Sequence, residues 1–383
     1  MTKLVRSAEA VGRGHPDKIA DLIADSLLDS LIEKLGIKET RLSAEVLVSY
    51  KKVLIAGEGS SHPEVDFSEI AKKILYLSGY ESNKFEILLD YKEQSKELSQ
   101  LTTGCNYSND QGIVFGYASK DSEELLPLEH LLVKRLALKI FKLREDGTFW
   151  WAKEDFKLLA QLELTYSDSH RLEKARLATL VCSIQHLEVI TREQIETDLK
   201  IKAIFPILEE LDILFDPNTS WFINTSGSFL IGGLKADSGS TNRKQIADSF
   251  GPIAHHGGGG LSGKDLTKID RLGAYYARWV VKNIVASGLA QELELKIVYA
   301  IGQPEAISYL ITSSKKLQFP SEKITNLIKS CFPTKVRDIF NYFTSFKFSF
   351  AELAEESHFG LNPELPWEQL NKVQEIRDWS NKL

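Results

Sequence analysis

The sequence predicts an α+β fold in which strands and helices alternate along the chain. Apolar residues recur at three- and four-residue spacing over 16–35, the period of a helix that buries one face. Short β-rich runs separate this segment from further helical patterns. Several of these runs end in glycine, as in VLIAGEG, FLIGG and VYAIG, which favours one α+β unit used more than once.

The clearest element is the helix over 16–35, because Pro16 suits the first helical position and Gly36 suits the stop. The apolar period predicts further helices at 67–78, 123–143, 188–199, 266–287, 321–331 and 366–380. Strands are expected within 41–59, 84–90, 112–118, 174–186, 220–225, 228–233 and 293–302. Two long connections, 98–110 and 234–265, are polar or glycine-rich, and such loops are often functional.

Composition favours a multidomain globular protein that handles a small anion. The 383 residues are 43% hydrophobic and 26% charged, which provides for several cores. A net charge of −6 argues against a nucleic-acid or membrane partner. The three cysteines form no C-x-x-C pair, so we expect buried thiols in a reducing cytoplasm. No apolar signal-peptide core is seen, and the most apolar later stretch, 275–290, contains Arg278 and Lys282.

The segment GHPDK, residues 14–18, places His15 and Asp17 at a predicted helix N-terminus, where free amides attract anions. A phosphate fits there, with Asp17 holding its metal ion. The alternative is a solvated helix face, because acidic residues recur every fourth position. These residues are Asp17, Asp21, Asp25, Asp29 and Glu33.

The segment DSGSTNRK, residues 237–244, delivers Arg243 and Lys244 together from a turn that begins at Asp237. A point charge beside a planar guanidinium suits a polyphosphate. Surface loops without a function often have the same composition. This segment alone is therefore a weak signal.

The segment HHGGGGLSGKD, residues 255–265, is a glycine-rich loop that suits backbone contact with an anion. Residues 258–264 fit the start of a P-loop, but Asp265 replaces the Ser or Thr that would bind the metal, and no good strand precedes it. Lys264, Lys268 and Arg271 follow on neighbouring turns, with Asp270 near them. Together the three segments suit a metal-chelated polyphosphate better than acyl transfer, since no G-x-S-x-G or H-E-x-x-H occurs.

The ordered segments GHPDKIAD, NDQGIVFGYA, FLIGG, DSGSTNRK, HHGGGGLSGKD and YAIG resemble S-adenosylmethionine synthetases, also called methionine adenosyltransferases. The match spans nearly the whole chain. It implies three similar α/β-sandwich domains related by a pseudo-threefold axis, at 3–98, 106–229 and 231–370. It also implies a dimer, or a pair of dimers, whose active sites draw on both subunits.

The family binds ATP and L-methionine. The methionine sulfur displaces triphosphate from the ribose C5′, and the triphosphate is then hydrolysed to phosphate and diphosphate. Sulfur needs no activated side chain, so orientation and well-placed cations lower the barrier. Mg²⁺, two ions per site, and K⁺ are the implied cofactors.

Carried over to this sequence, the resemblance makes His15, Arg243, Lys244 and Lys264 the catalytic and polyphosphate-binding residues. Asp17 and Asp270 are the implied magnesium ligands, and Glu45 the implied potassium ligand. Further implied ATP contacts are Asp168, His170, Ser228, Phe229, which stacks on adenine, Asp237 and Gly260. The implied methionine contacts are Glu58, Gln94, Asp110, Asp237, Lys268 and Ile301. Taken alone, Glu45 and Glu58 equally fit solvent-facing strand residues.

Several positions depart from the family pattern. Arg13 replaces an acidic residue, Ser228 replaces a basic one, and Asn242 stands where glycine is usual. The segment 95–109 is shorter than the family's active-site loop. The family's Asp-x-Lys nucleotide contact has Asp168, Ser169 and His170 as its nearest candidates, and histidine in place of lysine weakens the positive charge at neutral pH.

Two other functions compete with an active synthetase. One is a catalytically silent homologue that serves as a regulatory subunit, which the departures at Ser228, His170 and 95–109 suggest. The other is a P-loop ATPase or phosphotransferase, which Asp265 disfavours. An assay of methionine-dependent ATP turnover by the purified protein separates all three.

Overall fold

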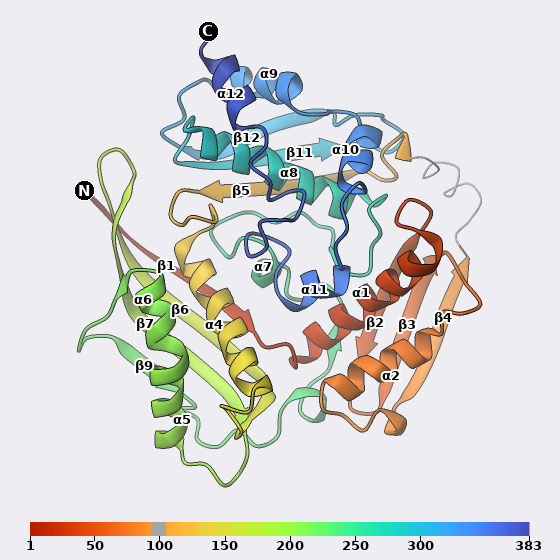
Figure 1. Cartoon of the computed structure of the whole chain (residues 1–383), viewed down its shortest axis with the longest axis vertical. Helices are drawn as coiled ribbons and strands as arrows, with labels where there is room; N and C mark the ends of the chain where they lie inside the picture. The colour runs from red at the N-terminus through yellow and green to blue at the C-terminus, as the bar shows by residue number, and fades with distance from the viewer. Residues whose placement is uncertain (94–104, 383) are drawn as a thin grey trace.

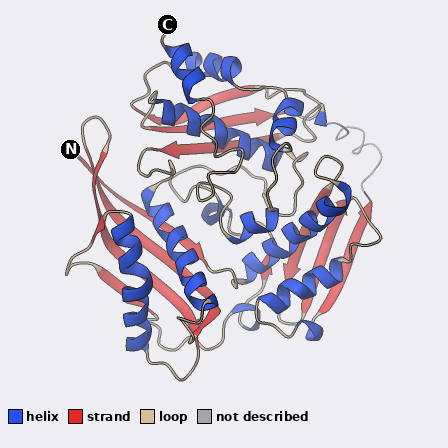
Figure 2. Ribbon diagram, in the orientation of Figure 1, coloured by secondary structure: helices blue, strands red, loops and turns tan. Residues whose placement is uncertain are grey.

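The computed structural model describes residues 1–93 and 105–382. Three units of sheet and helix surround a central region that contains α7 (Gln245–Asp248) and α11 (Phe350–Glu355) (Figure 1). In each unit, helices cover one face of the sheet (Figure 2). This arrangement confirms the predicted α+β fold of three similar units.

The sheets share strands across the chain. The first sheet orders β10 (Gly239–Ser240), β2 (Leu42–Val48), β3 (Lys52–Gly59) and β4 (Glu86–Glu93). The second orders β1 (Thr2–Val11), β6 (Ala152–Tyr166), β7 (Leu172–His186) and β8 (Ile213–Leu214), and β9 (Ser220–Ile223) also pairs with β7. The third orders β12 (Ser308–Lys315), β11 (Glu292–Tyr299) and β5 (Gly112–Ser119). Each sheet therefore includes one strand that is distant in sequence from its other strands: β10 in the first, β1 in the second and β5 in the third.

The helices cover these sheets in sequence order. α1 (Pro16–Leu35) and α2 (Phe67–Leu77) belong to the first unit. α4 (Leu128–Glu145), α5 (Arg192–Asp198) and α6 (Phe205–Glu210) belong to the second. α8 (Ile269–Ser287), α9 (Ser321–Cys331), α10 (Val336–Phe343) and α12 (Val373–Ser380) belong to the third.

Each predicted helical segment contains a helix, but α12 begins at Val373 and not at 366, and α6, α10 and α11 were not expected. α1 begins at Pro16 and ends before Gly36, whose φ of 86° suits glycine at a helix C-terminus. The predicted strand at 228–233 is wrong, since residues 228–232 form a loop and Gly233 then opens a short 3₁₀ turn. Strands β1 and β6 were not expected, although their ten-residue antiparallel register is long. In β1 the buried row includes Arg6, which interrupts the apolar alternation. In β6 the alternation is visible, because the apolar residues at 158, 160, 162, 164 and 166 are all buried, and this signal was overlooked.

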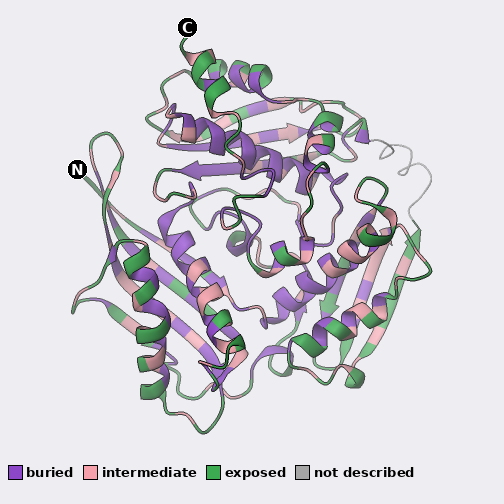
Figure 3. Cartoon of the chain, viewed as in Figure 1, coloured by how far each residue is buried: buried purple, intermediate pink, exposed green. Residues whose placement is uncertain are grey.

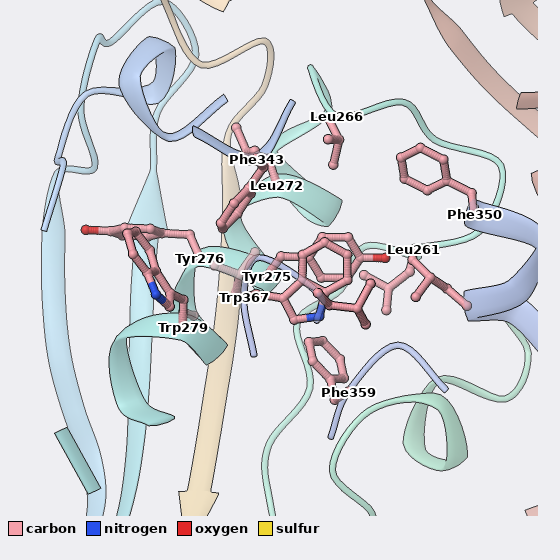
Figure 4. Packing of buried hydrophobic residues seen from close by; sticks show 14 of the residues in the cluster. Leu261, Leu266, Leu272, Tyr275, Tyr276, Trp279, Phe343, Phe350, Phe359 and Trp367 are labelled. Carbon is pink, nitrogen blue, oxygen red and sulfur yellow. The ribbon is translucent and has the colours of Figure 1, made fainter. Parts of the chain in front are cut away.

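The buried core is continuous between the first and third units, whereas the second unit has its own core. In the core shared by the first and third units, Tyr275 stacks on Trp367, with ring centroids 3.8 Å apart (Figure 4). Most of α8, which carries Tyr275, is buried, and so are the first turns of α1 (Figure 3). The cysteines are buried and free, as expected; they are Cys105, Cys182 and Cys331. None of the described helices is long and apolar enough to cross a membrane.

Candidate active site

The N-terminus of α1 lies at the junction of the first and second units. His15 is its N-cap, and its Nδ1 accepts a hydrogen bond from the Asp17 N–H at 3.2 Å. Only glycine fits at position 14, because a Cβ there would lie 2.0 Å from the Glu154 Cβ. Burial and the positive charges of Lys244 and Lys157 lower the pKa of His15 to about 4, so its imidazole is neutral at pH 7.

Asp17 is buried where the cation loop, residues 237–244, crosses α1. Its Oδ1 accepts from the Ser240 N–H at 3.0 Å, and its Oδ2 pairs with Lys244. Arg243 lies 3.5 Å from the same carboxylate. Burial alone would raise the pKa of Asp17, but hydrogen bonds from Lys244 and Ser240 hold it below its usual value. We call His15, Asp17, Arg243 and Lys244 the α1 subsite.

The acidic face of α1 is buried, so the interpretation as a solvated face is wrong from Asp17 to Asp25. Each aspartate accepts a backbone N–H from a loop: Asp17 from Ser240, Asp21 from Asn242 at 2.8 Å, and Asp25 from Gly263 at 2.8 Å. Asp29 accepts from Phe350 and Ala351 at the start of α11. Only Glu33 at the end of this row is exposed. The four-residue spacing therefore serves to hold loops in place.

The glycine loop, residues 255–265, carries Lys264 to the start of α8. The Lys264 Nζ lies 2.7 Å from the Asp270 Oδ2, and a Cβ at Gly259 would overlap this carboxylate. Asp265 accepts backbone N–H groups of Leu42 and Thr267, each at 2.7 Å. Asp265 thus has a structural role, which agrees with the argument against a P-loop. We call Gly259, Lys264 and Asp270 the α8 subsite.

Asp110 and Ile301 lie beside the α8 subsite. Gly302 donates to the Ser108 carbonyl at 2.9 Å, which joins the segments that carry these two residues. Both are exposed, with Ile301 at 49%. Asn109 accepts from the Ile269 N–H at 2.9 Å at the start of α8.

Of the other predicted methionine contacts, Glu58 and Lys268 also lie near the α8 subsite. Glu58 faces Ser43 across β3 and β2, and Ser43 bridges to Lys264. Lys268 is the buried N-cap of α8. Gln94 lies outside the described residues.

The remaining nucleotide and potassium candidates are spread around the two subsites. Phe229 is half-buried, and its N–H donates to the His186 Nε2 at 3.0 Å, whereas Ser228 is exposed. Asp237 is close enough to His15 to affect its pKa. Glu45 accepts a hydrogen bond from the Thr241 hydroxyl. Gly260 lies against the Asn242 side chain.

Three family models match the chain in succession. They describe the N-terminal, central and C-terminal domains of S-adenosylmethionine synthetase and match residues 3–101, 106–229 and 231–369. The chain belongs to the S-adenosylmethionine synthetase family. Named S-adenosylmethionine synthases from Leuconostoc mesenteroides and Mesoplasma florum are 39% and 35% identical over 97% and 98% of this chain. They are matched over 98% and 100% of their own length. S-adenosylmethionine synthase 1 of Pinus contorta is 38% identical over 98% of each chain.

The structure does not bring Asp168 and His170 to the α1 subsite of this synthetase-family chain. They lie in the β6–β7 turn, where Asp168 pairs with the N-terminal amine at 3.0 Å. β1 runs antiparallel to β6, with Thr2 opposite Tyr166 and Val11 opposite Lys157. The ten residues of β1 therefore separate this turn from the α1 subsite by about 30 Å.

A different Asp-x-Lys, Asp155-Phe156-Lys157, lies beside the α1 subsite. Lys157 is close enough to His15 to lower its pKa. Asp155 accepts from the Gly233 N–H at 2.7 Å, in the segment that follows Phe229. The spacing was visible in the sequence, but only the pairing of β6 with β1 places it next to His15.

The synthetase-family departure at Arg13 has a structural partner. Its guanidinium pairs with Glu355 of α11 at 2.6 Å and lies over the Phe141 ring at 5.2 Å. Arg13 thus joins the first residues of the chain to α4 and α11. An acidic residue would place two like charges together here.

Proposed function

We propose that the protein makes S-adenosylmethionine from ATP, L-methionine and water, releasing phosphate and diphosphate. The observation that carries this proposal is the convergence of two loops on α1. Each loop presents a lysine paired with a carboxylate, Lys244 with Asp17 and Lys264 with Asp270. Such pairs suit a chelated polyphosphate, because its oxygens can replace the carboxylates on the lysines while metal ions occupy the carboxylates.

In the proposed reaction, the methionine sulfur forms a bond to the ribose C5′ as the bond from C5′ to the triphosphate oxygen breaks. The electron pair leaves with the triphosphate, so negative charge grows on the bridging oxygen. Neutral His15 can donate a hydrogen bond to that oxygen, and Arg243, Lys244 and Lys264 stabilise the charge on the other phosphates. Water then cleaves the held triphosphate to phosphate and diphosphate.

Magnesium fits the proposed site. Mg²⁺ is usually held by one or two carboxylates together with substrate phosphates, and Asp17 and Asp270 each supply one. Among residues 1–93 and 105–382, no three acidic, histidine or cysteine side chains gather to form a complete metal cage. When bound, magnesium would neutralise phosphate charge. Glu45, joined to Thr241 of the cation loop, offers an oxygen ligand for potassium.

We assign the adenine of ATP and the methionine to the residues that lie near each subsite. Phe229 would stack on adenine, and Asp155 and Lys157 replace Asp168 and His170 as the proposed Asp-x-Lys contact. Methionine would lie near the α8 subsite, among Glu58, Asp110, Lys268 and Ile301, with Asp237 contributing from the side of His15. Gln94 would complete this set.

We also propose that the protein is a dimer or a pair of dimers. Exposed apolar side chains lie on strands of all three sheets, and in the first sheet Leu47 and Leu88 flank Leu54 in one continuous row. Contiguous exposed apolar patches mark interaction surfaces. The exposed side chains include Val5, Leu47, Leu88, Ile113, Leu159 and Leu310. Light scattering should give at least twice the 43.1 kDa chain mass; a monomer at micromolar concentration would contradict this proposal.

Lys264→Ala tests the polyphosphate assignment. It should lower kcat about 10²- to 10³-fold, because one preorganised cation is lost where charge develops. Production of S-adenosylmethionine and phosphate is measured with and without methionine. Lys296→Ala in β11 is the control and should keep normal turnover. Unchanged turnover in Lys264→Ala would refute the assignment, and methionine-independent ATP hydrolysis by the unmodified protein would instead support an ATPase.

A further inference from the structure

Phe229, the ring proposed to stack on adenine, lies in a loop. Residues 228–232 belong to no helix or strand, and residues 225–228 just before the ring are exposed. A ring that is held in place before the ligand arrives binds more tightly, because ordering a mobile side chain on binding costs affinity. The contacts that fix Phe229 therefore decide how well it can stack.

His186, the last residue of β7, bonds both backbone polar groups of Phe229. Its N–H donates to the Phe229 carbonyl at 3.0 Å, and its Nε2 accepts from the Phe229 N–H at 3.0 Å. His186 is itself firmly placed, since it lies opposite Ala152 in the second sheet and is 5% exposed. One strand residue thus carries the position of the sheet into the loop.

The neighbouring backbone selects the form of the His186 ring that can do this. Its Nδ1 lies 2.8 Å from the Leu187 carbonyl, which can only accept, so Nδ1 carries the hydrogen and Nε2 is an acceptor. Leu187 is held in turn, because its N–H donates to the Trp151 carbonyl at 2.8 Å. A hydrogen on Nε2 would instead face the Phe229 N–H.

Two further residues fix the loop on either side of this contact. The Gln185 Nε2 donates to the Leu230 carbonyl at 3.1 Å. Gly232 packs against the ring, because a Cβ there would lie 2.8 Å from the Phe229 Cε2. These contacts support the loop after the ring and leave the Phe229 N–H to His186.

We infer that His186 is a positioning residue that fixes the Phe229 ring for stacking on the adenine of ATP. The inference rests on the proposed function, which assigns that ring to adenine. His186 acts through Phe229 and needs no contact with ATP. What the role requires is a hydrogen-bond acceptor at the place of Nε2.

His186→Asn and His186→Gln form a matched pair that tests this requirement. Glutamine can place an amide oxygen near the position of Nε2. Asparagine is one methylene shorter, so it can donate to the Leu187 carbonyl but does not reach the Phe229 N–H. A non-hydrolysable imido analogue of ATP with Mg²⁺ should bind about 3- to 10-fold more weakly to His186→Asn by calorimetry. His186→Gln should recover most of this loss.

Steady-state kinetics and a ligand without adenine supply the controls. In His186→Asn, KM for ATP should rise by the same factor and kcat should change less than about twofold, because the contact serves ground state and transition state alike. Inorganic tripolyphosphate with Mg²⁺ should bind equally to both variants and to the unmodified protein. Equal affinities of the two variants for the imido analogue would overturn the inference. So would an equal loss of affinity for tripolyphosphate.

Gln185→Leu takes the place of His186→Asn if that variant does not fold. It removes the bond to the Leu230 carbonyl and should weaken the imido analogue about 2- to 3-fold, with tripolyphosphate affinity unchanged. Unchanged affinity for the imido analogue would then overturn the inference.

A double-mutant cycle separates this inference from the proposed function. In a Phe229→Ala background, His186→Asn should change the affinity for the imido analogue less than about twofold, because the ring that it positions is gone. If Phe229→Ala binds weakly and His186→Asn is normal, the inference is wrong and the adenine assignment stands. If Phe229→Ala binds normally, the adenine assignment is wrong and the inference falls with it.

Discussion

Arg6 shows how single residues stabilise buried charge in this molecule. Its guanidinium pairs with Asp121 at 2.9 Å and with Glu292 at 3.3 Å, which joins β1 to the third unit. Glu129, at the start of α4, is a third carboxylate in the same buried environment, and its Oε2 has no hydrogen-bond partner among residues 1–93 and 105–382. One guanidinium cannot compensate three carboxylates, so one of them is favoured in its protonated form.

Glu129→Gln should therefore stabilise the protein in alkaline conditions. Burial raises the pKa of Glu129 from 4.5 to about 7, so the folded state keeps a proton that the unfolded state releases between these values. Stability from this group is complete below pH 4.5 and is lost as pH rises through 7. The variant should be more stable at pH 8, by about 1–3 kcal/mol, and nearly equal to the unmodified protein at pH 5.

Urea unfolding at both pH values measures this difference. Exposed Glu123→Gln is the control and should show no pH-dependent gain. A constant difference between Glu129→Gln and the unmodified protein across the range would contradict the assignment.

At the scale of elements, α1 combines a core face with a row of aspartates that hold loops. Asp25 also forms a bidentate ion pair, because the Arg271 guanidinium of α8 donates to both of its oxygens, at 2.7 and 2.9 Å. Both side chains are fully buried. The pair therefore joins α1, whose N-terminus carries the α1 subsite, to α8, whose N-terminus carries Asp270 of the α8 subsite.

Asp25→Asn should destabilise the fold strongly. It leaves the Arg271 charge buried without compensation, which typically costs about 3–5 kcal/mol. Denaturant midpoints at pH 7 measure the loss. Glu33→Gln, on the exposed last turn of α1, should change stability by less than about 0.5 kcal/mol. Similar midpoints for the two variants would show that the buried pair contributes little.

Much of the fold was predictable at this scale, because helix signals are local. Pro16, Gly36 and the apolar period define α1 without knowledge of the rest of the chain. The role of its aspartates was not predictable, since a solvated acidic row and a loop-binding row have the same four-residue spacing. Lys157 was missed for a related reason: the register between β1 and β6 decides which residues meet His15.

At the scale of the whole molecule, the shared strands make the three units interdependent. β1 completes the second sheet, β5 completes the third, and β10 completes the first. The implied boundaries at 3–98, 106–229 and 231–370 divide the sequence into three parts, but each of the three sheets in the described part of the chain combines strands from two of them. The two subsites lie where these parts meet, since α1 receives loops that follow it by more than two hundred residues.

This sharing of strands sets an order for assembly on the ribosome. The second sheet has all of its strands once residue 223 has been synthesised, whereas the first sheet must wait for β10 at Gly239–Ser240. The unit that emerges first is thus completed after the one that follows it. Until then, the edge of β2 that will receive the cation loop stays open in the nascent chain.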